Sequence, residues 1–99
     1  GEFDDPAIRN ALLSLSDHRD YRVRIAVIRA LAFSESETSS DRVQFLTKML
    51  EDSDYLVRGF AAKTLGQVGS SQALNALRAR IAKEENKVVL AIINKLLKS

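Results

Sequence analysis

The sequence predicts an all-α protein, built as an α-solenoid of three helical hairpins. The segment DYRVRIAVIRAL at 20–31 returns as DYLVRGFAAKTL at 54–65, with the same opening and the same distance to its final leucine. Apolar residues recur at spacings of three and four, as on one face of a helix, and no segment alternates as a half-buried strand would. Because a single hairpin cannot bury its apolar face alone, we expect the units to stack on one another.

Six helices are expected, in three pairs. Each unit has a first helix, a tight turn and a second helix, and the helices are predicted at residues 6–16, 20–33, 41–51, 54–68, 71–83 and 86–98. The units then cover residues 6–33, 41–68 and 71–98 of a single domain, 6–99, after a cloning remnant or N-terminal tail, 1–5. Since Met49 is the sole methionine, we also expect the chain to be a piece of a longer protein.

Capping residues support these boundaries. Asp5 is a suitable N-cap for the first helix, and Pro6 suits its first helical position. Asp20 and Asp54 stand where the second helices of units one and two begin, and Gly69 is suited to end a helix.

The third copy of the repeat is degenerate. It reads NKVVLAIINKLL at 86–97, and aligning its Val88 with Val57 keeps the apolar positions of the motif. This alignment predicts that Val88, Ile92 and Leu96 face the core.

The repeated residues resemble the HEAT repeat family, in particular its short variety named after phycobilisome lyases. That variety reads Asp, a short turn, and then Val-Arg-x-x-Ala-x-x-x-Leu. The pattern stands here as Asp17, Val23-Arg24, Ala26/Val27 and Leu31, and again as Asp52, Val57-Arg58, Ala61 and Leu65. The third copy has Lys83 and Val89 in place of the Asp and the Arg. Over residues 6–98 the resemblance implies a HEAT-like superhelix and a recognition function.

The repeated arginines, Arg24 and Arg58, allow two interpretations. They could bind a ligand as a pair. The favoured interpretation is structural, because a guanidinium is suited to planar, multi-donor contacts with a carboxylate. Each arginine would then bond the turn aspartate of a neighbouring unit, Asp17 or Asp52, and so form a ladder between repeats.

The outward side of the second helices is the candidate surface for a partner. Residues seven apart lie on one side of a helix, and the repeat register joins them into a ridge across the units. The ridge mixes basic and aliphatic side chains, namely Arg22, Ile25, Arg29, Leu56, Lys63, Lys87 and Leu90. Such a surface suits an acidic amphipathic protein segment, whereas the alternative is a helix face kept soluble by its basic residues.

The last helix carries more apolar residues than inward packing needs. Val89, Ile93 and Leu97 are the additional ones and are expected on its outer surface. A large exposed apolar patch marks an interface. We therefore expect another repeat, a partner or a second copy of the chain to cover it, which makes a homodimer through the C-terminal helix a hypothesis.

The sequence lacks the residues that several classes of function require. The chain has no cysteine, and His18 is its only histidine, without companions at metal-ligand spacing, so neither a metal nor another cofactor is expected. It shows no phosphate loop and no nucleophile elbow, and we expect no enzyme. Its apolar runs are too short to span a membrane, and a cytoplasmic location is expected.

The leading function is therefore a non-catalytic scaffold or protein–protein interaction module. The alternative is binding of nucleic-acid phosphates, because residues 55–99 carry eight Lys and Arg against two acids, whereas residues 1–54 carry seven against eleven. Its candidate residues are Arg78, Arg80, Lys83, Lys87, Lys95 and Lys98. The resemblance adds a third, less favoured function, participation in bilin attachment or removal.

Overall fold

The computed structural model describes residues 6–32 and 39–98. The predicted tail, 1–5, and the predicted cap Asp5 lie outside these residues. Within them, all regular structure is helical, which confirms the all-α solenoid. The helices are α1 (Pro6–Leu15), α2 (Tyr21–Ala32), α3 (Ser39–Met49), α4 (Tyr55–Val68), α5 (Ser71–Ile81) and α6 (Lys87–Lys98). These bounds lie within two residues of the predicted ones.

The ends of α4 follow the capping residues that the sequence contains. The Asp54 side chain accepts a hydrogen bond from the Leu56 amide at 2.8 Å and so caps the first turn. Gly69 ends the helix at φ 67°, in the left-handed region that disfavours other residues, and its amide donates to the Leu65 carbonyl at 3.0 Å. Ser70 then caps α5. Two helices therefore meet in a turn of two residues.

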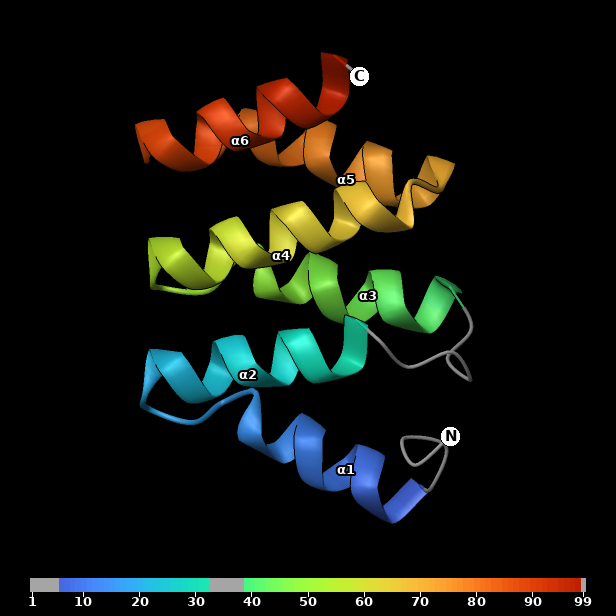
Figure 1. The fold of residues 1–99 in the computed structure, drawn as a ribbon. Coiled ribbons are helices and arrows are strands. Elements are labelled where there is room, and N and C mark those ends of the chain that lie inside the picture. Colours follow the sequence, from blue (N-terminus) through green and yellow to red (C-terminus); the bar gives the residue numbers. More distant parts are fainter. Residues whose placement is uncertain (1–5, 33–38, 99) are drawn as a thin grey trace.

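The second helices α2, α4 and α6 stack side by side in one layer, and α3 and α5 lie behind them (Figure 1). Helix α4 is central, because it contacts α2, α3, α5 and α6. The molecule measures 36 × 29 × 15 Å, and the shortest extent is that of two packed helix layers. None of the described helices is long and apolar enough to cross a membrane.

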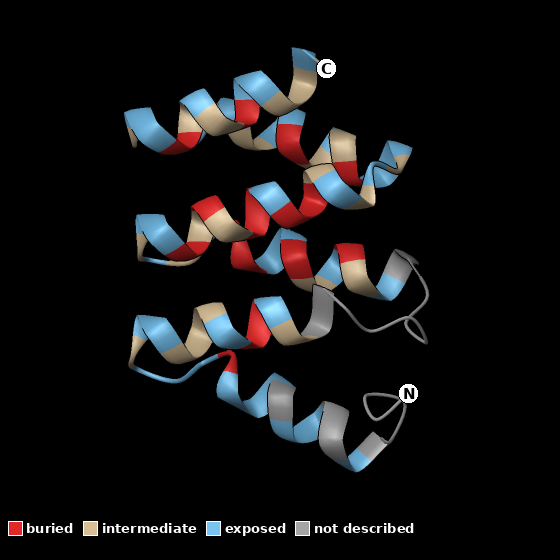
Figure 2. Ribbon diagram, in the orientation of Figure 1, coloured by how far each residue is buried: buried red, intermediate tan, exposed pale blue. Residues whose placement is uncertain are grey.

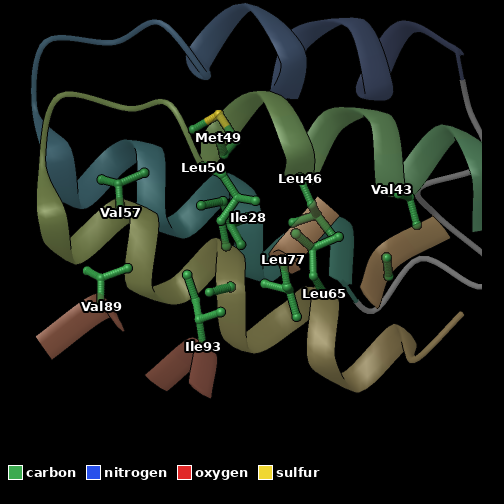
Figure 3. Close-up of a cluster of buried hydrophobic side chains, with 13 residues drawn as sticks. Ile28, Val43, Leu46, Met49, Leu50, Val57, Leu65, Leu77, Val89 and Ile93 are labelled. Atoms are coloured by element: carbon green, nitrogen blue, oxygen red, sulfur yellow. The ribbon is translucent and has the colours of Figure 1, made fainter. Parts of the chain in front are cut away.

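The core runs through the stack and joins the units to one another. Its fully buried side chains include Ile28 of α2, Leu46 of α3, Leu65 of α4, Leu77 of α5 and Ile93 of α6 (Figure 3). Buried residues gather on the sides of α3 to α6 that face a neighbouring helix (Figure 2). Neighbouring units therefore bury apolar side chains of α2 to α6 against one another.

The predicted register of α6 is wrong by one residue. Val88, expected inside, is 58% exposed, whereas Val89 is fully buried. The reason lies at the cap: the Asn86 side chain accepts hydrogen bonds from the amides of Val88 and Val89, so Asn86 takes the place of Asp54. The third residue after each cap faces the core, which is Val57 in α4 and Val89 in α6.

This register predicts opposite outcomes for two neighbouring valines. Val89→Ala removes two buried methyl groups and should lower the free energy of unfolding by about 2 kcal/mol. Val88→Ala is the matched control and should change it by less than about 0.5 kcal/mol, because Val88 is mostly in solvent. Urea denaturation of both variants measures the difference, and equal losses would contradict the register.

Candidate functional site

Two arginines of the second helices join successive units. Arg24 donates from Nε and Nη2 to the carboxylate of Asp52 at 2.8 and 3.0 Å, and from Nη1 to the His18 carbonyl at 2.6 Å. Arg58 repeats the arrangement one unit later, with its donors on the Glu84 carboxylate at 2.9 and 3.0 Å and on the Asp52 carbonyl at 2.8 Å. We call these contacts the arginine ladder.

Each carboxylate of the arginine ladder also organises its own turn. Asp52 accepts from the Asp54 amide at 2.9 Å, and Glu84 accepts from the Asn86 amide at 3.0 Å. Both acids therefore stand two residues before the cap of a second helix. His18 has that place in unit one, where its Nδ1 accepts from the Asp20 amide at 3.0 Å. The turn position is thus His18, Asp52 and Glu84 in the three units.

The sequence alignment missed part of this set. Asp17, a predicted partner in the arginine ladder, is exposed and makes no ion pair with a described residue. Glu84 was overlooked because the alignment put Lys83 at the turn position. The third arginine position belongs to Leu90, not to Val89. The sequence signal that identifies Glu84 is an acidic residue two positions before a capping Asp or Asn.

Glu84 is the most enclosed charge of the arginine ladder. Its side chain has no exposed surface, and it accepts a further hydrogen bond from Arg80 Nε at 3.2 Å. Burial raises the pKa of the Glu84 carboxyl, but hydrogen bonds from Arg58, the Asn86 amide and Arg80 outweigh burial. The pKa of Glu84 therefore lies below its ordinary value of 4.5.

The helices α2, α4 and α6 contain neither Asp nor Glu, so no carboxylate belongs to the helical part of their outward side. With the corrected register, three columns cross the helices, and we call them the second-helix face. They are Arg22, Leu56 and Val88; Ile25, Gly59 and Ala91; and Arg29, Lys63 and Lys95. Two predicted members leave it: Lys87 falls in the column of Tyr55, and Leu90 in that of Arg58.

The second-helix face combines exposed cations with exposed apolar side chains. Leu56 and Val88 are 39% and 58% exposed, and Ile25 is half-buried. Lys63 extends over the ring of Phe60, with Nζ 5.6 Å from the ring centroid. Arg22 is held near the start of α2 by Asp20, and this hydrogen bond lowers the pKa of Asp20 to about 2.

The predicted apolar outer surface of α6 is smaller than expected. Val89 and Ile93 have no exposed surface and belong to the core that α6 shares with α4, while Leu97 is half-buried against that core. The prediction that these residues face outward followed from the misplaced register. Within α6, Val88 is the exposed large apolar residue.

Comparison with known proteins agrees with this architecture. The family model for HEAT repeats matches residues 36–98, more than half of the chain. The chain belongs to the HEAT repeat family. HEAT repeats are commonly protein-interaction scaffolds and are generally non-catalytic. No curated protein and no solved structure matches significantly. Among the described residues of this HEAT domain, no His, Asp and Glu side chains gather as a metal site would require.

Removing one partner from the arginine ladder should destabilise this HEAT domain strongly. Arg58→Ala would leave the enclosed Glu84 carboxylate with Arg80 as its remaining cation, and should lower the free energy of unfolding by about 3 kcal/mol. The control Arg22→Ala removes the exposed pair with Asp20 and should leave the stability nearly unchanged. Adding Glu84→Gln to Arg58→Ala should cost less than the sum of the single changes, and additive losses in urea would contradict the coupling.

Acid should weaken the domain through Glu84. Because folding lowers the pKa of Glu84, its stabilisation is complete above the unfolded value near 4.5 and is lost as the pH falls through the folded value. Urea denaturation at several values from about pH 6 to pH 3 should show a steeper loss in the native chain than in Glu84→Gln. Parallel pH profiles would exclude this role of Glu84.

Proposed function

We propose that this HEAT domain is a non-catalytic protein-interaction module whose second-helix face binds an acidic segment of a partner protein. The observation that carries the proposal is the complete absence of Asp and Glu from α2, α4 and α6. Arg29, Lys63 and Lys95 occupy one column of that face and make no ion pair with a described residue. A carboxylate-bearing segment would meet attraction at every helix it crosses.

The apolar residues of the second-helix face give the same partner a second means of binding. Leu56 and Val88 are exposed in the column next to Gly59, so a segment lying across α4 and α6 would touch both a cation and an aliphatic side chain. Apolar burial supplies affinity, and charge complementarity supplies orientation and association rate. An acidic amphipathic segment fits both requirements.

Nucleic-acid binding draws less support from the geometry. Of the six candidate cations, Arg80 is engaged by the enclosed Glu84, and Arg78 lies on α5 in the other layer, where it donates to Asn75. Lys83 follows the end of α5, and its Nζ lies 3.9 Å from Glu51 Oε1. The basic residues of the C-terminal half are therefore divided between the two layers of helices rather than gathered in one stripe.

Panning a random peptide display library on the domain tests the proposal. The selected peptides should be acidic with an aliphatic residue, and raising the salt from about 50 to about 200 mM should weaken their binding. The double variant Arg29→Glu/Lys63→Glu should weaken it by at least about tenfold.

The matched control is Arg78→Glu/Lys83→Glu, which makes the same charge change outside the second-helix face and should alter binding by less than about twofold. Equal effects of the two double variants would contradict the proposed surface. Tight, salt-sensitive binding of a single-stranded oligonucleotide, with no peptide selected, would favour the nucleic-acid alternative instead.

A further inference from the structure

We propose that the second-helix face contains a socket for one branched aliphatic side chain of the partner, placed so that a neighbouring carboxylate of the partner meets Lys63. The inference rests on the proposed function and identifies where on the face the partner is anchored. It follows from a hollow between α4 and α6, from the residue that creates it, and from the charge at its edge.

The hollow has a volume of about 130 Å³ and opens between α4 and α6. Gly59 and Val89 are its buried members, whereas Leu56 and Val88 are exposed at its mouth. Phe60 and Ile92 complete its apolar lining, and Tyr55 and Lys63 contribute the polar groups. A cavity of comparable volume, about 150 Å³, accommodates benzene, so the hollow suits the end of a leucine-like side chain.

Gly59 creates this space. Its column holds Ile25 in α2 and Ala91 in α6, so the central helix of the stack lacks a side chain in this column. A Cβ at Gly59 would meet Ile92 Cδ1 at 3.6 Å, an ordinary contact, and packing within the chain therefore leaves room for alanine. Glycine inside a helix is destabilising relative to alanine, and no contact closer than 3.6 Å excludes an alanine Cβ here.

Gly66 lies about two turns after Gly59, on the same side of α4, and provides a contrast. A Cβ there would come within 2.6 Å of Leu96 Cδ2, so any residue other than glycine would displace the Leu96 side chain. The Leu96 side chain fills the space beside Gly66, whereas the space beside Gly59 remains open and forms the socket.

The charge at the socket determines the chemistry of its occupant. Lys63 Nζ lies 5.6 Å from the centroid of the Phe60 ring, and Phe60 lines the hollow. Lys95 holds the corresponding place on α6, and neither helix has an acid to neutralise the two lysines. An apolar anchor adjacent to Asp or Glu therefore satisfies both the socket and its edge.

A small-molecule titration followed by NMR tests the socket directly. The probe is isocaproate, which carries a leucine-like branched end and one carboxylate. We expect saturable shifts of the Val88, Val89 and Ile92 methyl groups and of the Gly59 amide, with a dissociation constant on the order of millimolar. Acetate, which lacks the branched end, and isocaproamide, which lacks the charge, should each bind at least about threefold more weakly.

Two variants separate the socket from the charge. Gly59→Ile places the residue of the equivalent α2 position in the hollow and should abolish the methyl shifts and weaken the selected acidic peptides by at least about tenfold. Gly59→Ala should weaken the binding of isocaproate and of the selected peptides by about threefold, and should raise the melting temperature by roughly 4 °C. This second variant keeps the test decisive if Gly59→Ile does not fold.

Peptides that bind Gly59→Ala and Gly59→Ile as tightly as the native chain, yet lose affinity in Arg29→Glu/Lys63→Glu, would overturn the socket and leave the proposed function in place. Isocaproate shifts confined to residues outside the hollow would likewise overturn the socket. Peptides insensitive to all of these variants would overturn the proposed function itself.

Discussion

The carboxylates of Asp52 and Glu84 each hold two parts of the chain at once. Each accepts two hydrogen bonds from the arginine of the preceding unit and one from an amide at the start of its own second helix. A bidentate pair fixes orientation as well as distance. The arginine ladder therefore sets where each second helix begins relative to its neighbour, and the alignment of the apolar residues in the stack depends on it.

Small residues let the aligned helices approach closely. Ala61 and Ala62 are fully buried in α4, and Gly66 admits Leu96 from α6. Had α6 begun one residue earlier or later, Leu96 would have missed the gap at Gly66, and Val89 would have turned out of the core. The cap at Asn86 and the arginine ladder at Glu84 thus place the apolar contacts of the last unit, including the hollow beside Gly59.

The fold class and all six helices could be predicted because repetition, helical spacing and capping residues agree within each unit. The register of α6 could not be read from apolar residues, since VVL and AII offer an apolar side chain at every position and fit two alignments equally well. Polar residues decide between them: Asn86 and Glu84 match Asp54 and Asp52 only in the observed register. The socket could not be predicted from the sequence either, because it depends on the distance between α4 and α6 and not on either helix alone.

Although the net charge is only +2, the cations form two groups with different surroundings. Arg24, Arg58 and Arg80 are at most 14% exposed and are directed at carboxylates of the turns, where they hold the stack together. Arg29, Lys63 and Lys95 are exposed on helices without acids. Within residues 6–32 and 39–98, the acids lie in the turns and in α3, and Asp20 is paired with Arg22 of the second-helix face. The contacts that fix the repeat register therefore leave Arg29, Lys63 and Lys95 without a carboxylate on their own helices, and recognition of an acidic partner would depend on this column of cations.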